Sequence, residues 1–184
     1  MIILHYKLTE QEYLDYNFYT NWLAPDKRTR RFIYYYLTPL LYLVILGFLF
    51  YKPGKGGFDN ISVVIGLIGL IALMLITRFR IRGRFDKQVL KMINSSAPDT
   101  VLPETELTIS ETGISGKTKI AEVKYPWNAF QKKVVANNCC YLYVNAGQAV
   151  VIPLRIFKTT QEKDAFEKML SEQLPLQAEL PTME

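Results

Sequence analysis

The chain has 184 residues, about the length of one domain by the usual prior of roughly 100–200 residues per domain. Its formal charge of +5 is unevenly divided, because residues 1–97 carry a net +7 and residues 98–184 a net −2. A nucleic-acid-binding protein needs a basic face on a folded domain, so this distribution argues against nucleic acid as a partner. A cleavable signal peptide is also a poor interpretation, because the first apolar run follows 31 residues that include four acidic side chains.

Residues 1–31 are predicted to hold a short strand over Ile2–Tyr6 and then an amphipathic helix beside the membrane. Thr9 and Glu12 have the spacing of a capping box, which marks a helix start. The apolar side chains that gather on one side of this helix are Tyr13, Leu14, Phe18, Trp22 and Leu23. This face either lies on a lipid surface or packs on the chain's own soluble domain, and the residues alone leave both open.

Two long uncharged runs follow, over residues 32–51 and 61–77. As a helix, the first spans about 30 Å, the thickness of a hydrocarbon core, and the second is at the short end of the usual range. A helix on the surface of a soluble protein normally shows a polar face, and neither run has one. We therefore expect a hairpin of two transmembrane helices over residues 32–77.

Basic residues flank this hairpin on its outer sides, whereas the short segment between the spans has a net charge of only +1. Because Lys and Arg beside a span remain on the cytoplasmic side, both termini of this multi-pass protein are predicted to be cytoplasmic. The residues that determine the orientation are Lys27, Arg28, Arg30, Arg31, Arg78, Arg80, Arg82 and Arg84.

Small residues form a face on the second span, at Ser62, Gly66 and Gly69. Such a face lets two helix backbones approach closely. The contact lies either within the hairpin or between two copies of the chain, so a homo-oligomer stays open. Neither span carries a charged side chain, and we therefore expect no proton relay and no counter-charge for a substrate.

Residues 78–97 are predicted to form a basic connector helix, and residues 98–175 a small β domain in which the hydrophobic period changes to two. Asn137-Asn138 suits a two-residue hairpin turn, because Asn tolerates positive φ. Thr159 and Glu162 form a second capping box, which opens a C-terminal helix. Residues 176–184 are predicted as a flexible tail. The expected strands are Glu104–Ser110, Ile114–Lys119, Ala121–Tyr125, Phe130–Ala136, Cys139–Val144 and Ala149–Pro153.

With the N-terminal strand, the count is seven strands and one closing helix. A pleckstrin-homology-like domain has this inventory, and so does a β meander with a helix. The fold class expected is thus an α+β membrane protein, a two-helix transmembrane hairpin plus a small antiparallel, pleckstrin-homology-like β domain closed by a C-terminal helix. Whether residues 2–6 pair with the C-terminal sheet is not decided by the pattern.

Three short motifs resemble the YcxB-like family of bacterial membrane proteins: LTEQEYLDYNFY, YPWNAF and VVIPLRIF. The order of basic cluster, two spans and short loop is similar as well. The resemblance implies a bacterial cytoplasmic (inner) membrane, and it brings no established activity. The positions that match the family's C-terminal domain are Tyr125, Pro126, Trp127, Pro153, Arg155 and Phe157.

No catalytic, cofactor-binding or metal-binding set is recognisable, so we expect a protein that is not an enzyme. His5 is the only histidine, and the chain has no nucleophile elbow. Cys139 and Cys140 are adjacent, which fits two small strand residues better than a disulfide or a metal site. The glycine-rich stretch 54–57 lacks the full spacing of a phosphate loop.

Trp127, Arg155 and Phe157 remain as candidate interaction residues. Trp127 either closes one end of the β domain or forms an aromatic wall of a binding groove. Arg155 either pairs with an acidic neighbour or helps to bind an anion such as a phosphorylated headgroup.

The function expected is a membrane-anchored, non-enzymatic cytoplasmic module for binding or regulation. Besides the lipid bilayer, its partner would be a protein or an anionic lipid headgroup. The alternative is a structural or assembly subunit of a membrane complex, acting through the hairpin.

Overall fold

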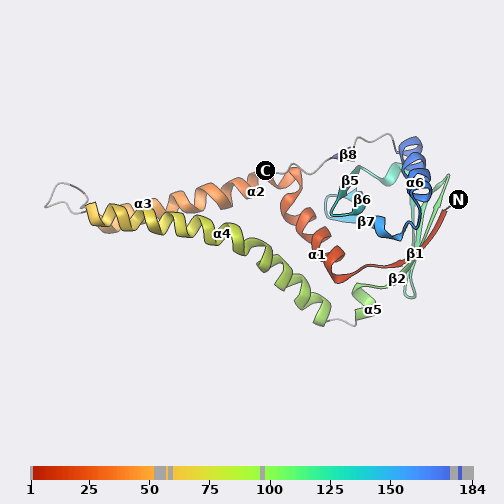
Figure 1. Cartoon of the computed structure of the whole chain (residues 1–184), viewed down its shortest axis with the longest axis horizontal. Coiled ribbons are helices and arrows are strands. Elements are labelled where there is room, and N and C mark those ends of the chain that lie inside the picture. Colours follow the sequence, from red (N-terminus) through yellow and green to blue (C-terminus); the bar gives the residue numbers. More distant parts are fainter. Residues whose placement is uncertain (1, 52–56, 58–59, 96–97, 175–177, 180–184) are drawn as a thin grey trace.

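The computed structural model describes residues 2–51, 57, 60–95, 98–174 and 178–179. Two long apolar helices extend from a domain that is built of two β-sheets and a C-terminal helix (Figure 1). The prediction of an α+β protein with a β domain closed by a C-terminal helix is confirmed to this extent.

The N-terminal segment consists of strand β1 (Ile2–Lys7) and helix α1 (Glu10–Phe18). The predicted capping box is confirmed: Thr9 Oγ1 accepts a hydrogen bond from Glu12 N at 3.2 Å, and Glu12 Oε2 accepts one from Thr9 N at 2.8 Å. Both bonds satisfy amide groups that a helix start would otherwise leave without a partner. The helix continues as a π-helical turn, Tyr19–Leu23, and ends before Pro25.

The first long apolar helix is assembled from α2 (Arg28–Phe32), a π-helical turn (Ile33–Leu37) and α3 (Thr38–Phe50). The widened turn lies directly before Pro39. A proline removes one backbone hydrogen bond from a helix interior, and the wider hydrogen-bonding pattern of the π-helical turn accommodates this loss.

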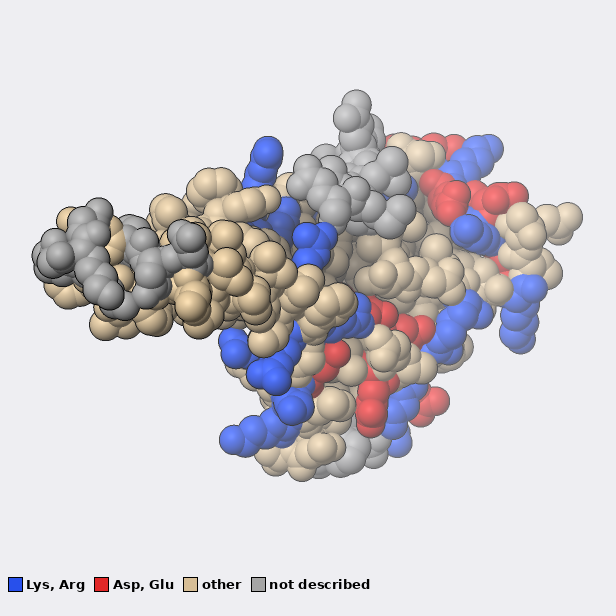
Figure 2. All heavy atoms as spheres, turned by 60° about the vertical axis from the view of Figure 1, so that its left-hand side comes forward, with Lys and Arg blue, Asp and Glu red and all other residues tan. Residues whose placement is uncertain are grey.

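The second long helix, α4, runs without interruption from Asn60 to Ser95. Residues 78–97 are therefore not a separate connector helix, since most of them continue the apolar helix as its charged end. Residues 78–95 contain no proline, and their single glycine, Gly83, lowers the helix propensity by only about 1 kcal/mol. In Figure 2, the described part of the hairpin shows a surface without charged side chains, and Lys and Arg gather where the hairpin meets the domain.

The small face of α4 packs within the hairpin. A Cβ atom at Gly69 would lie 2.5 Å from Tyr42 Oη of α3, and one at Gly66 would lie 3.8 Å from Leu46 Cδ1. The sequence leaves open whether this face packs within the hairpin or between two copies of the chain, and the structure has the contact within the hairpin.

The β domain has a first antiparallel sheet in the order β1-β2-β3-β4. Its register runs from Ile2 opposite Ile109 to Lys7 opposite Glu104, so the N-terminal strand does pair with the C-terminal part of the chain. The hairpin is consequently inserted between two neighbouring strands of one sheet. The strands that complete it are β2 (Glu104–Ser110), β3 (Gly113–Lys117) and β4 (Glu122–Pro126).

The second sheet has the order β7-β6-β5-β8. The turn between β5 and β6 is the predicted one, with φ of 51° at Asn137 and 58° at Asn138. Of the predicted tail, residues 176–184, the structure describes only β8 (Ala178–Glu179), which pairs in parallel with β5 and so supplies partners for backbone groups along that edge; the other tail residues lie outside the described residues. The other strands are β5 (Lys132–Ala136), β6 (Cys139–Asn145) and β7 (Gln148–Pro153).

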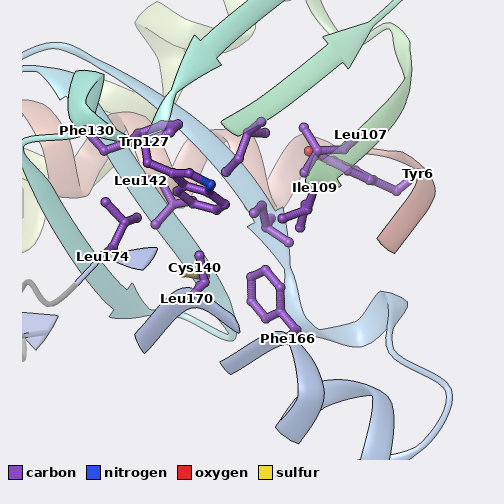
Figure 3. Packing of buried hydrophobic residues seen from close by; sticks show 12 residues of the cluster. Tyr6, Leu107, Ile109, Trp127, Phe130, Cys140, Leu142, Phe166, Leu170 and Leu174 are labelled. Carbon is purple, nitrogen blue, oxygen red and sulfur yellow. The ribbon is translucent and has the colours of Figure 1, made fainter. Parts of the chain in front are cut away.

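The main core lies between the two sheets and helix α6 (Thr160–Gln173) (Figure 3). Alternate residues of β2 and β6 point into it, as the period of two requires. β6 is buried on both faces, because its other residues pack against the N-terminal segment. The central side chains are Leu107, Ile109, Leu142, Ile152, Phe166 and Leu170.

Candidate functional site

Helix α1 and the π-helical turn after it lie between the β domain and the long helix α4 (Figure 1). On one side, Leu14 packs with Val89 and Ile93 of α4. Further along the same side, Phe18 and Trp22 pack with residues of α4 and of the first apolar helix. Of the predicted apolar face, Leu14, Phe18 and Trp22 therefore pack on the two long helices, which is neither of the two surfaces that the sequence leaves open, a lipid surface or the chain's own soluble domain.

The opposite side of the same segment packs on β6. The rings of Tyr16 and Tyr19 lie 5.6 Å and 5.8 Å, between centroids, from the ring of Tyr141. Thr20 Oγ1 and Tyr143 Oη share a hydrogen bond of 2.7 Å in the interior. Burial raises the pKa of Tyr143, so this phenol stays protonated and able to donate. The segment is thus packed against the domain on one side and against α4 on the other.

Arg155 joins the N-terminal segment to the C-terminal domain. Its Nε donates to Glu12 Oε1 at 2.6 Å, and one Nη donates to Glu12 Oε2 at 3.0 Å and to the Lys7 carbonyl at 2.8 Å. Burial raises the pKa of the Glu12 carboxyl, but hydrogen bonds from Arg155 and Thr9 outweigh it and hold the pKa below its usual value. Of the two roles predicted for Arg155, the structure has the pairing with an acidic neighbour.

Trp127 is buried in the main core of the β domain. Only 9% of the residue is exposed, its Nε1 donates to the Ser110 carbonyl at 3.0 Å, and its ring lies 6.0 Å from that of Phe130. It therefore does not form the wall of an open groove. Phe157 stacks on Phe166 of α6, with 4.9 Å between ring centroids. Among the described residues, no hydrogen bond, ion pair or ring contact connects Trp127, Arg155 and Phe157 with one another.

A cleft of about 270 Å³ is lined by residues of α1, β7 and the first sheet. Tyr6 Oη donates to the Val151 carbonyl at 2.7 Å. Tyr16 Oη donates to the Gly147 carbonyl and accepts from Ala149 N, both at 3.1 Å. These two phenols satisfy backbone groups of the edge strand β7 and of the turn that precedes it, which protects that edge from pairing with another chain. Sequence reasoning missed this role of Tyr6 and Tyr16, because it depends on a pairing across more than 130 residues.

The two cysteines of β6 and the acidic and histidine side chains are the possible sites of chemistry. Burial raises the pKa of both Cys139 and Cys140 to about 12, so neither thiol ionises to a nucleophile near neutral pH. In the part of the chain that the structure describes, no three His, Cys, Asp or Glu side chains are grouped to hold a metal ion. The glycine-rich stretch 54–57 lies, apart from Gly57, outside the described residues.

Several of the eight basic residues predicted to orient the hairpin have partners inside the protein. Lys27 pairs with Asp26 at 2.6 Å, Arg82 pairs with Asp15, and Arg84 donates to Tyr34 Oη at 3.1 Å. Arg31 donates through Nη1 to the carbonyls of three consecutive residues, Trp22, Leu23 and Ala24. Arg30 lies 5.9 Å from the ring centroid of Trp22.

These features define an α+β protein with a β domain divided by two helices that are long and apolar enough to cross a membrane. Residues 109–170, which run from the end of β2 into α6, match the family model described as YcxB-like protein. The resemblance to this family that the motifs predict is thereby confirmed. The chain matches no curated protein and no solved structure with which it was compared.

Proposed function

We propose that this chain is an integral protein of a bacterial cytoplasmic membrane, whose β domain is a non-enzymatic module for binding and regulation. The observation that carries this proposal is the insertion of the apolar hairpin between β1 and β2, two paired strands of one domain. Any shift of these strands relative to each other acts on both long helices at once.

Membrane insertion is supported by the outward-facing side chains of the hairpin. Phe48 is 87% exposed and Ile61 is 73% exposed, and the most apolar stretches of both helices are almost entirely unburied. In water, a continuous apolar surface of this length would drive aggregation, whereas a hydrocarbon layer solvates it. The basic residues lie at the domain end of the hairpin, which favours a cytoplasmic domain and cytoplasmic termini.

A pleckstrin-homology-like architecture is the second part of the proposal. It is supported by the division of the first seven strands into β1–β4 and β5–β7, and by the packing of α6 into the core that they share. A domain of this architecture is suited to recognition of a protein or a headgroup. The cleft between α1, β7 and the first sheet is the surface we assign to recognition.

A photo-crosslinking amino acid in the full chain tests this proposal in living cells. The full chain is required because residues 98–175 lack β1, one of the four strands of the first sheet. The probe is placed at Val123, which lines the cleft and is 42% exposed, and as a control at the exposed Glu167 of α6. A specific protein or lipid adduct at 123 and none at 167 is expected.

The absence of any adduct from the cleft contradicts the assignment of recognition to this surface. Adducts only from lipid-facing positions such as Val64 would instead support a structural subunit that acts through its hairpin. The small face of α4 does not by itself support that alternative, because Gly66 and Gly69 face the other helix of the same hairpin.

A further inference from the structure

A cavity of about 480 Å³ lies where the two apolar helices meet the segment that follows α1. Its walls are formed by both long helices and by the π-helical turn Tyr19–Leu23. It combines three arginines with aromatic rings, and none of the described residues that line it is acidic. The residues of the lining that carry the inference are Trp22, Arg28, Arg31, Tyr35, Tyr36 and Arg78.

Within the residues that the structure describes, no acidic side chain pairs with these three arginines. Arg28 and Arg78 have no ion pair or hydrogen bond within the described residues, in contrast to Lys27 and Arg82 nearby, which pair with carboxylates. Arg31 is held in place through Nη1 by three backbone carbonyls, and these carry no net charge. The cavity therefore has an unbalanced positive charge on a partly fixed framework.

From this geometry we infer that the cavity binds the phosphodiester headgroup of an anionic phospholipid. Guanidinium groups are suited to phosphate oxygens, because their planar fork of donors bonds two oxygens together. The inference rests on the proposed membrane insertion, which brings the headgroup layer to this end of the hairpin. Tyr35 and Tyr36 then lie at the interface, where aromatic rings are usual, and basic pockets beside spans are known headgroup sites.

Arg30 and Arg80 provide a matched control. They lie on the same two elements, α2 and α4, carry the same charge and are exposed. Neither is part of the cavity lining, and Arg30 lies 5.9 Å from the ring centroid of Trp22, which is part of it. Replacing Arg28 and Arg78 by Gln, or Arg30 and Arg80 by Gln, removes two positive charges in each case. Any difference between the two double variants therefore reports the site and not the general attraction of a basic protein to anionic lipid.

The experiment is native mass spectrometry of the detergent-solubilised full chain, titrated with phosphatidylglycerol and in parallel with phosphatidylcholine. The expected result is one phosphatidylglycerol bound more tightly than any phosphatidylcholine. R28Q/R78Q should weaken this binding by about tenfold for each arginine. The loss of one hydrogen bond to a charged group lowers the affinity by about this factor. R30Q/R80Q should change it less than about twofold. R28K/R78K, which keeps the charge but loses the fork, should fall between them.

Equal binding of the two lipids, or equal losses in the two Gln variants, overturns the inference. Competition by millimolar glycerol phosphate as effective as that by the lipid also overturns it, because the site would then take a free phosphate. Alkaline carbonate extraction of membranes separates this failure from failure of the proposed function. A protein that resists extraction but shows no lipid preference loses only the headgroup site, whereas a protein released by carbonate loses the proposed function.

Discussion

The contact between Arg155 and Glu12 is expected to hold the N-terminal segment onto the β domain. We consider R155A, E12A and the double variant. R155A removes three hydrogen bonds, two to the Glu12 carboxylate and one to the Lys7 carbonyl. E12A removes the same carboxylate and also one half of the capping box at the start of α1.

The magnitude follows from these bonds and from their exposure. A hydrogen bond to a charged group contributes about 1.5–3 kcal/mol when sheltered. The Arg155 side chain is 44% exposed and that of Glu12 13%, so solvent screening reduces the coupling of the pair to about 1–2 kcal/mol. E12A should cost about 1 kcal/mol more than this, because the cap is lost as well. The double variant should cost less than the sum of the single ones.

Hydrogen exchange of the full chain in detergent measures the local opening free energy of β1 and α1 in the four proteins. A double-variant cycle on the Lys163–Glu167 pair of α6, an exposed contact of 3.7 Å, is the control and should give a coupling below about 0.5 kcal/mol. A coupling between positions 12 and 155 as small as that of the control would refute the reasoning.

The same contact gives an expected pH dependence. The pKa of Glu12 lies below its ordinary value of 4.5 in the folded protein. Its contribution to stability is therefore fully present above the unfolded pKa and is lost as pH falls through the lower folded pKa. Protection of β1 should decrease on acidification below about pH 4.5 in the wild type. In E12Q this component should be absent, and an identical acid profile in the two proteins contradicts the assignment.

Two further predictions concern the hairpin and the buried thiols. Gly69→Leu collides with Tyr42 and should destabilise the detergent-solubilised protein by about 1–3 kcal/mol in thermal unfolding. Gly47→Leu is the control and should be nearly neutral, because no atom lies within 4 Å of the added Cβ. Equal effects of the two variants would argue against the contact between Gly69 and Tyr42. Cys139 and Cys140 have pKa values of about 12 because they are buried, so both should resist a thiol reagent at pH 8 in the folded protein. Both should react after denaturation. Rapid labelling of the native protein would show that β6 is not buried.

Local features of the fold could be predicted well from the sequence because their signals are local. Residues Glu104–Ser110 alternate in hydrophobicity and form a strand with the predicted bounds. Thr9 and Glu12 form their cap within one helical turn. Asn137 and Asn138 tolerate the positive φ that a two-residue turn demands.

The features that needed the structure depend on contacts between distant residues. No periodicity reveals that β1 pairs with β2 across the whole hairpin, or that Glu12 is the acidic neighbour of Arg155. The change from apolar to charged residues near Arg78 predicts the end of a helix, but the backbone of α4 continues through it. The sequence shows Trp127 as an aromatic residue beside a proline, but only the packing shows that its ring faces the core.

Labelling of single cysteines in intact cells tests the central claim that a membrane hairpin interrupts one cytoplasmic β domain. The positions are Gly56 between the spans, His5 on β1 and Glu172 on α6, in a background without Cys139 and Cys140. An impermeant maleimide should label only position 56 before permeabilisation, and positions 5 and 172 should react together afterwards. Labelling of either 5 or 172 in intact cells would contradict the orientation, and labelling of one without the other would contradict the pairing of β1 with β2 itself.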